Sequence, residues 1–347
     1  MTNIKDIAKK AGVSVATVSH VINDTRYVSD ELKKRVYDSM RELDYHPNTL
    51  ASSLRSGRTR TIGLIVPDIS NLFFADVARK IEDRGLEHDH SVILCNSDDD
   101  EEKEAKYIDV LIAKQVDGII FISAGFNNKH LQKLMSKRIP IVVADRDLAD
   151  VAADVVIVDN LNGGYIATKY LISLGHRKIA CISGPSRLTP SAQRIEGYRK
   201  ALDEAGIIEN GSLQTAGDFR FQGGEDAMTK LLESVDPPTA VFACNDMMAV
   251  GAMRAIHNKG LNVPEDISII GFDDIQISQR VYPSITTIAQ PMKEMAEKVV
   301  DYLIERIRIK SDRKIEKEPD FHKTILETYL VVRDSCAFPK ETVFRSG

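Results

Sequence analysis

The chain has 347 residues, 43% of them hydrophobic, so it is long enough for a small domain and a large one. No stretch approaches the roughly 18 consecutive apolar residues of a membrane helix, and the polar start MTNIKDIAKK lacks the apolar core of a signal peptide. The four cysteines are scattered without a CxxC pair, which argues against a disulfide framework or a metal site. We therefore expect a cytoplasmic protein with free thiols, no membrane contact and no cofactor.

Charge is distributed unevenly along the chain. Residues 1–60 contain eleven Lys or Arg and seven Asp or Glu, which leaves +4 there and −9 in the remainder of a chain whose net charge is −5. A basic module on an acidic body attracts a polyanion such as DNA to the module, while the body is repelled. The charge pattern therefore supports nucleic-acid binding by the first 60 residues.

The opening segment, TNIKDIAKKAGVSVATVSHVIN, predicts a helix, a tight turn and a second helix. The apolar residues at positions 4, 7, 8 and 11 recur at helical spacing and form one face of the first helix. Gly12 is suited to the sharp turn, and Ser14 is a favourable N-cap for the second helix. Val18 and Val21 can pack inward, which leaves the other face of the second helix exposed near its start. A helix-turn-helix presents this end to base edges in the major groove.

The side chains on that exposed face indicate how DNA is read. Val15 and Ala16 are too short for paired hydrogen bonds and favour thymine methyl groups, while His20 can donate to guanine. We therefore expect these three residues to contact bases. Neighbouring hydroxyl and amide side chains are expected to contact phosphates and set the register. These predicted phosphate contacts are Ser14, Thr17, Ser19 and Asn23.

A third predicted helix covers residues 30–43 and is followed by HPNTLASSLRSG. Pro, Asn, Gly and four Ser or Thr give this segment weak intrinsic structure. Asn48 followed by LASSL nevertheless permits one or two helical turns with Leu50, Ala51 and Leu54 on one face. A helix this short is marginal on its own.

The whole stretch resembles the N-terminus of the LacI–GalR repressor family almost position by position, in IKDIAKKAGVS, ATVSHVIN, VSDELKKRV and LDYHPNTLASSLRSG. The resemblance implies a homodimeric bacterial repressor on palindromic operator DNA, and hence a cytoplasmic, nucleoid-associated protein. It also implies that the short helix folds on the operator and inserts a leucine into the minor groove. The matching leucine is Leu54, and Ala51 and Arg55 lie beside it.

From Thr61 the sequence changes to short β-branched runs that alternate with helical stretches. The strand-like runs are TIGLIVPD, SVILCNS, DGIIFIS, PIVVAD, VVIVDN, KIACISG, TAVFACND and SIIGFDD. The helical stretches are 74–89, 101–114, 194–205, 223–234 and 247–259. Buried strands alternating with helices predict an α/β body of two doubly wound parallel sheets, in which ligands bind at the carboxyl ends of strands.

The family resemblance implies the same body, a periplasmic-binding-protein-like core of two lobes with a cleft between them. The expected domains are a helix-turn-helix domain at 1–46, a hinge at 47–60, a core at 61–340 and a tail at 341–347. By the resemblance, the chain crosses between the lobes near Asn160, Gln290 and His322. The first lobe then comprises about 61–160 and 291–322, and the second about 161–290 and 323–340.

An enzyme is a different class of function, and the sequence disfavours it. There is no GxSxG, GxxxxGK[ST] or HExxH motif and no GxGxxG after a strand. The strand-end carboxylates Asp145, Asp273 and Asp274 have no nucleophile, metal cluster or phosphate-binding loop beside them. We interpret them as groups that hold a ligand, and expect no catalytic residue and no metal site.

Polar and aromatic side chains follow the predicted strands at the ends where such a cleft opens. Carboxylates accept hydrogen bonds from sugar hydroxyls, guanidinium groups and amides donate them, and aromatic rings cover the C–H faces of a sugar. Two acids balance two bases in this set, which favours a small neutral polar ligand. The predicted ligand-binding residues are Asn71, Phe73, Phe74, Asp145, Arg146, Arg194, Phe219, Asn245, Asp273 and Gln290.

The same positions resemble, motif by motif, the site of ribose-binding proteins and ribose-responsive repressors, in NLFF, VADRD, SAQRIEGY, GDF, ACND, GFDD and TIAQP. The resemblance implies ribose or a related pentose as the effector, acting as an inducer. Arg187 and Asp147 depart from the pattern and change the charge near the cleft. Another small polar ligand therefore stays open.

Other functions of related classes also stay open. Purine-responsive members of the family usually carry tryptophan where Arg146 stands, and phosphocarrier-dependent catabolite regulators generally lack the Asp–Arg pair. A sugar-binding transport protein would share the body but would have a signal peptide and no helix-turn-helix. The tail PKETVFRSG has no apolar heptad repeat, so we expect a homodimer rather than a tetramer.

Overall fold

The computed structural model describes residues 2–23, 26–45, 58–122, 128–146, 152–209, 211–311 and 320–340. The chain divides into two compact units, Met1–Thr59 and Arg60–Gly347. The predicted hinge residues Ala51, Leu54 and Arg55 lie outside the described residues, as does Asp147. Within the described part, no helix combines the length and apolar character needed to cross a bilayer.

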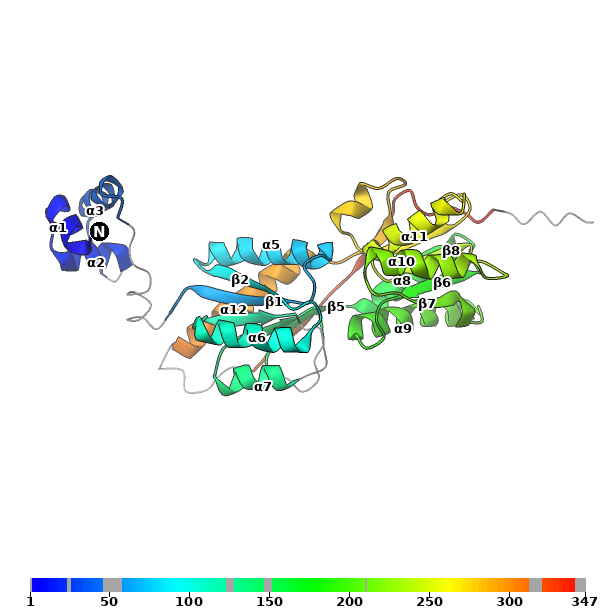
Figure 1. The fold of residues 1–347 in the computed structure, drawn as a ribbon, viewed down its shortest axis with the longest axis horizontal. Helices are drawn as coiled ribbons and strands as arrows, with labels where there is room; N and C mark the ends of the chain where they lie inside the picture. Colours follow the sequence, from blue (N-terminus) through cyan, green and yellow to red (C-terminus); the bar gives the residue numbers. More distant parts are fainter. Residues whose placement is uncertain are drawn as a thin grey trace, which may run out of the picture. The chain divides into compact units, whose positions relative to one another are not determined.

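The first unit consists of three helices, α1 (Ile4–Ala11), α2 (Val15–Asn23) and α3 (Asp30–Glu42), which Figure 1 shows in blue. Apolar side chains from all three meet in one small core, as the sequence predicted for the first two helices. The buried members of this core are Ile7, Ala8, Ala11, Val18, Val21, Val28 and Val36.

Local hydrogen bonds explain where the first two helices begin and end. The Asn3 side chain caps α1 by accepting from the Asp6 amide, and the Asp6 side chain accepts from the Asn3 amide in return. Gly12 follows α1 at φ 64°, a left-handed conformation that permits the predicted turn. Ser14 Oγ accepts from the Thr17 amide at 3.0 Å, which confirms the predicted N-cap of α2.

The first lobe of the second unit contains a six-stranded parallel sheet in the order β11-β5-β4-β3-β1-β2. Alternate residues of its strands face two separate cores, one under α5 and α12 and one under α6 and α7. Its strands are β1 (Thr61–Val66), β2 (Ser91–Asn96), β3 (Gly118–Phe121), β4 (Ile141–Ala144), β5 (Asp154–Val158) and β11 (Lys323–Leu326). Its helices are α5 (Leu72–Glu87), α6 (Glu101–Ala113), α7 (Asn128–Ser136) and α12 (Met292–Ser311).

The second lobe contains another six-stranded sheet, in the order β12-β10-β9-β8-β6-β7. Figure 1 labels β6, β7 and β8 of this sheet among the helices that cover it. Its strands are β6 (Ile179–Ser183), β7 (Gln214–Ala216), β8 (Ala240–Ala243), β9 (Ser268–Asp273), β10 (Thr286–Ala289) and β12 (Tyr329–Val331). Its helices are α8 (Asn160–Ser173), α9 (Thr189–Glu204), α10 (Phe221–Leu232) and α11 (Asp246–Asn258), with short 3₁₀ turns η1 (Gly211–Leu213) and η2 (Gln276–Gln279). The two doubly wound sheets predicted from the sequence are confirmed.

One strand departs from the expected parallel arrangement, because β12 pairs with β10 in antiparallel fashion. The preceding strand, β11, runs parallel to β5 and therefore toward the cleft. After crossing the cleft the chain enters the second sheet from the edge toward which the parallel strands of that sheet run. A strand that enters from this edge must run opposite to them.

The chain passes between the lobes three times. The first passage lies between β5 and α8, the second between β10 and α12, and the third between β11 and β12. The expected position of the third passage, near His322, is wrong. Lys323–Leu326 pairs with β5 in the first sheet, so the passage lies at residues 327–328. The segment is a partly exposed edge strand, and its sequence pattern is correspondingly weak.

Several helices begin earlier than the sequence pattern indicated, and the difference is largest for α9. α9 starts at Thr189, so Arg194 lies inside the helix rather than opening it. Pro190 occupies the first turn, where its fixed φ is favourable and its missing N–H is not needed.

Helices α8 and α9 approach each other through glycines. A Cβ added to Gly197 would lie 2.0 Å from the Leu161 carbonyl oxygen, and one added to Gly164 would lie 2.2 Å from the Arg194 carbonyl oxygen. Both obstacles are backbone atoms, which cannot swing aside. The glycines therefore fix the distance between the helices and with it the position of Arg194.

We predict that Gly197→Ala lowers the free energy of unfolding by about 1–3 kcal/mol, the usual effect of overpacking, although alanine is the better helix former. Urea denaturation followed by circular dichroism measures this change. Gly211→Ala is the matched control, because no atom lies within 4 Å of the position its Cβ would take. Equal stability of the two variants would contradict the steric explanation.

Candidate functional site

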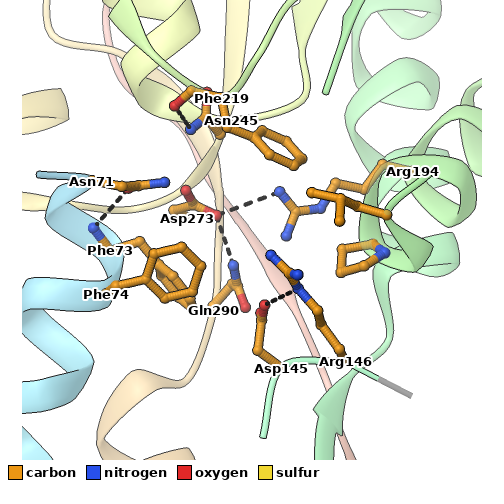
Figure 2. A pocket seen from close by; sticks show the side chains of 12 residues that line it. Asn71, Phe73, Phe74, Asp145, Arg146, Arg194, Phe219, Asn245, Asp273 and Gln290 are labelled. Atoms are coloured by element: carbon orange, nitrogen blue, oxygen red, sulfur yellow. Dashed lines mark hydrogen bonds and ion pairs between the residues drawn. The ribbon is translucent and has the colours of Figure 1, made fainter. Parts of the chain in front are cut away.

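A pocket with an empty volume of about 350 Å³ lies between the lobes of the second unit (Figure 2). All ten residues predicted from the sequence line it, and they come from both lobes. Leu188 and Pro190 line it too and were not predicted, since an apolar residue in a loop carries no sign of a binding role. The lining residues predicted from the sequence are Asn71, Phe73, Phe74, Asp145, Arg146, Arg194, Phe219, Asn245, Asp273 and Gln290.

The start of α5 contributes an apolar wall. Asn71 is the N-cap of this helix, and its Oδ1 accepts from the Phe73 amide at 3.1 Å. The rings of Phe73 and Phe74 meet edge to face with centroids 5.2 Å apart, and both are buried. The cap thus places two rings side by side, and Figure 2 shows them together at one side of the pocket.

Asp145 and Arg146 follow β4 and are both buried. Arg146 Nε lies 3.9 Å from Asp145 Oδ2. Burial raises the pKa of Asp145, while the positive charges of Arg146 and Arg194 oppose that shift. Burial likewise lowers the pKa of Arg146, against the effect of Asp145. Burial removes water from both groups, so each charged form is stabilised by the opposite charge of its neighbour.

Arg194 is held on several sides. Its Nε donates to Asn160 Oδ1 at 2.8 Å, and its Nη1 donates to the Cys244 carbonyl at 2.6 Å. The guanidinium carbon lies 3.6 Å from the centroid of the Phe272 ring, a cation–π contact. Nη1 also lies 3.6 Å from Asp273 Oδ1. This arginine has a fixed orientation before any ligand enters.

Asp273 and Gln290 meet at the centre of the site. Gln290 Nε2 donates to Asp273 Oδ1 at 2.6 Å. Burial raises the pKa of Asp273 to about 7, against the effects of Arg194 and the Gln290 hydrogen bond, while the charge of Asp145 raises it further. Gln290 lies in the passage between β10 and α12, so this bond joins the pocket to a segment that connects the lobes.

Phe219 and Asn245 close the side formed by the second lobe. Asn245 caps α11 through a hydrogen bond to its Oδ1 from the Met248 amide at 2.9 Å, and its Nδ2 donates to the Phe219 carbonyl at 2.9 Å. A Cβ on Gly184 would lie 2.2 Å from the Phe219 ring, so glycine leaves the space this ring occupies. The amide of Asn245 is already used to build the pocket wall.

Some polar atoms at the pocket remain without a hydrogen-bond partner among the described residues. Arg146 Nε and Nη1 are buried donors of this kind, and Gln290 Oε1 is a buried acceptor. Buried polar groups are nearly always hydrogen-bonded in folded proteins. Two donors and one acceptor facing one pocket therefore indicate a polar ligand or ordered water there.

The charge around Arg146 differs from that predicted. Asp99, which the sequence analysis did not single out, has Oδ1 4.0 Å from Arg146 Nη2. Arg187 is exposed, and its charge opposes that of Arg146. Asp99 and Arg187 therefore act on Arg146 in opposite directions, and Asp147 lies outside the described residues. The run of three aspartates at 98–100 was the available sign of this contribution from Asp99.

The predicted DNA-reading residues lie along α2 and the turn before it. Val15 is 41% exposed and Ala16 is also exposed, as predicted. Ser19 and His20 are half-buried, so the prediction that they face outward holds only in part. The remaining predicted contacts are Ser14, which is exposed, Thr17, which is half-buried, and Asn23, which ends α2.

Two family models match the chain. Residues 3–48 match bacterial regulatory proteins of the lacI family, and residues 59–330 match periplasmic binding proteins and the sugar-binding domain of the LacI family. The DegA regulator of Bacillus subtilis (strain 168) is 41% identical over 337 residues, covering 96% of this chain and 98% of that protein. The ribose operon repressor of Escherichia coli (strain K12) is 40% identical over 309 residues, covering 88% of this chain and 93% of that protein. The PurR repressor of Pasteurella multocida (strain Pm70) is 41% identical over 323 residues, covering 92% of this chain and 97% of that protein.

Solved structures agree with these matches. A LacI-family regulator from Enterococcus faecium with bound ribose superposes with a TM-score of 0.73 at 34% identity, over 81% of this chain and all of that one. The lac repressor dimer bound to operator superposes with a TM-score of 0.82 at 27% identity, over 97% of this chain and 99% of that one.

Fold and pocket together define a DNA-binding transcriptional regulator that responds to a small ligand. The chain belongs to the LacI family, whose members regulate transcription and are not enzymes. Operator DNA and a small effector are its partners, and a dimer is typical of the family. Relatives of about 40% identity carry three different names, so family membership does not select the effector.

The raised pKa of Asp273 leads to a prediction about stability. The folded chain keeps this proton up to pH about 7, whereas the unfolded chain loses it near 3.8, so between these values the folded state binds more protons. Stability from this group is therefore present at low pH and is lost as pH rises through 7. We predict that, without ligand, wild type loses stability relative to Asp273→Asn between pH 5 and pH 8.

Urea denaturation of both proteins at the two pH values measures this difference. The surface variant Asp203→Asn serves as control and should follow wild type at both values. If the stability difference between wild type and Asp273→Asn were the same at pH 5 and pH 8, Asp273 would not titrate in this range.

Proposed function

We propose that this regulator is a repressor that binds a palindromic operator as a homodimer and releases it when ribose or a closely related pentose occupies the cleft. The observation that carries the proposal is a set of buried atoms without a hydrogen-bond partner in the described part of the chain, Arg146 Nε, Arg146 Nη1 and Gln290 Oε1, beside two buried carboxylates. This set combines donors and acceptors in the way that vicinal hydroxyl groups require. Action on DNA would place the protein in the cytoplasm, on the nucleoid.

The remaining pocket chemistry supports a neutral sugar. When both carboxylates are ionised, Asp145 and Asp273 balance Arg146 and Arg194, while Asp99 and Arg187 act on Arg146 in opposite directions. A phosphorylated ligand would gain from surplus positive charge, which this balance does not provide. The rings of Phe73, Phe74 and Phe219 offer apolar surfaces to the C–H faces of a sugar. The similarity to a family member with bound ribose also supports this choice.

Control of DNA binding requires that the effector prefer one conformation. A ligand that contacts both lobes binds the closed cleft more tightly and shifts the population toward it. In the proposed mechanism this shift separates two DNA-binding units whose hinge residues, Ala51, Leu54 and Arg55, contact the minor groove. Two units are needed because one alone buries little surface on DNA.

A purine effector is the principal alternative, because the PurR relative is as similar as the ribose repressor. A flat base would leave the hydrogen-bonding capacity of Asp145 and the second guanidinium largely unused. Calorimetric titration with a panel of pentoses and purines separates the two. Tightening on DNA with a purine or with a phosphocarrier protein, without a response to ribose, would overturn the pentose assignment and leave the regulator assignment intact.

Arg146→Ala is predicted to abolish the response to ribose. The change removes the donors that face the pocket and leaves Asp145 as a buried charge without its neighbour. Breaking such a pair typically costs about 3–5 kcal/mol, a loss of roughly a hundredfold or more in affinity. Operator release against ribose concentration measures the effect, and operator affinity without ribose should stay unchanged.

The control for this variant is Arg199→Ala, which removes an arginine that pairs with Glu209 away from the pocket. It should respond to ribose as wild type does. A wild-type response from Arg146→Ala would exclude a role for this guanidinium in effector binding.

His20→Ala is predicted to relax the base preference at one position of each half-site, at roughly 1–3 kcal/mol, because its ring loses a donor to guanine. Binding to a library of operator variants measures this preference. A uniform loss across all sequences would instead identify His20 as a backbone contact. Val15, which is 41% exposed, provides a comparison, since Val15→Ala should affect positions that carry thymine.

A further inference from the structure

A charged bridge joins the two lobes outside the pocket lining. Arg220 is the N-cap of α10 in the second lobe, and Asp68 follows β1 in the first. Arg220 Nε and Nη2 lie 3.0 and 2.7 Å from Asp68 Oδ2. The two residues are 152 positions apart in the sequence, and neither lines the pocket.

Asp68 is held in place by its own lobe. It is 8% exposed, and its Oδ1 accepts from the Ser70 amide at 2.9 Å and from the Ser70 hydroxyl at 2.6 Å. Burial raises the pKa of Asp68, but hydrogen bonds from Ser70 and Arg220 outweigh this and hold the pKa below its ordinary value. The first lobe therefore presents a fixed, ionised carboxylate to the second.

Arg220 is connected to the pocket through its neighbour Phe219. The left-handed conformation of Phe219, with φ 65°, turns the chain so that the ring enters the pocket while the next side chain reaches the other lobe. The backbone on both sides is fixed, because Asp218 Oδ1 accepts from the Arg220 amide at 2.8 Å and Asn245 Nδ2 donates to the Phe219 carbonyl. A movement of the Arg220 backbone must therefore move Phe219.

We propose that Arg220 and Asp68 form a latch that favours the closed cleft and positions Phe219 against the bound effector. This inference rests on the proposed function only for the identity of the ligand. In an open cleft both charged groups would be solvated separately, and closure brings them together. A ligand that requires the closed cleft binds with an apparent affinity proportional to the fraction of closed molecules.

The exposure of the two side chains determines how strongly loss of the latch should weaken effector binding. The Arg220 side chain is 55% exposed, so water screens the pair, whereas the Asp68 side chain is only 11% exposed. The expected strength of the latch therefore lies between that of a surface ion pair and that of a buried one. We expect its loss to weaken effector binding roughly three- to tenfold, and the loss to diminish at high salt.

The first experiment is a double-mutant cycle in ribose affinity. Calorimetry is performed on wild type, Arg220→Gln, Asp68→Asn and the double variant. Each single variant should weaken binding, and the double variant should bind no more weakly than either single one. Arg220→Lys should recover part of the affinity, because lysine can donate one hydrogen bond to Asp68. Independent, additive losses would overturn the latch.

The matched control is Arg199→Gln. Its side chain is 53% exposed and pairs with Glu209 at 2.9 Å, but both partners belong to the second lobe. It removes a similar ion pair without affecting the contact between lobes, so ribose affinity should stay at the wild-type value. An equal loss in this variant would show that the Arg220 effect is not specific to the cleft.

A second experiment tests the latch without any ligand. Spin labels on Arg79→Cys in α5 and Lys230→Cys in α10, both exposed positions, report the distance between the lobes. Burial raises the pKa of Cys95 to about 11 and of Cys336 to about 12, and Cys181 and Cys244 are fully buried, so the native thiols react slowly. Dilution with unlabelled chains restricts the measurement to distances within one chain.

In the labelled protein, Arg220→Gln should shift the distance distribution toward longer values, while Arg199→Gln should leave it unchanged. An identical distribution for wild type and Arg220→Gln would overturn the latch. If wild type fails to bind ribose, the effector assignment is wrong, and the distance measurement still decides whether the latch exists.

Discussion

Four buried ionisable groups in one pocket must be matched to one another, and the arrangement of the second unit depends on that requirement. Removing a carboxylate or a guanidinium from water is unfavourable unless opposite charges and hydrogen bonds replace the solvent. Arg194 meets this condition fully, through Asp273, backbone and side-chain oxygens and the Phe272 ring. Arg146 meets it only in part, because two of its nitrogens lack partners among the described residues. The pocket thus has one fixed half and one half in which buried donors are left for the proposed effector.

The charged groups reach the pocket because the backbone turns sharply where strands end. Asp145, Phe219 and Asp273 adopt φ values of 67°, 65° and 117°, a region unfavourable for residues with a Cβ. Such strain persists where the surrounding structure determines the conformation, and it is common at binding sites. For Asp145 and Asp273 the buried strands β4 and β9 fix the backbone that leads into the turn, and for Phe219 the hydrogen bond from Asn245 Nδ2 to its carbonyl does so.

The three passages between the lobes link the pocket to movement. Gln290 lies on one passage and donates to Asp273, so a carboxylate of the pocket is bonded to a residue that connects the lobes. The latch of Asp68 and Arg220 adds a contact that forms when the lobes come together. A ligand affects DNA binding only through its different affinities for the two arrangements of the lobes. The passages between the lobes, the pocket and the latch therefore all act on the equilibrium between the open and closed arrangements of the lobes.

The sequence by itself determined the helix-turn-helix and the two doubly wound sheets, because periodicity, caps and strand ends are local features of the chain. Strand ends together with the family resemblance gave the ten pocket residues, but not the antiparallel strand β12. The sequence did not locate the third passage between the lobes or the start of α9, since a short edge strand and a proline-led turn leave weak patterns. Only the tertiary structure decided that the Asn245 amide is used by the pocket wall, whereas Arg146 has donors without partners in the part of the chain that the structure describes. It also decided that Asp68 meets Arg220. Contacts between residues 152 positions apart depend on how two lobes pack, which no local pattern records.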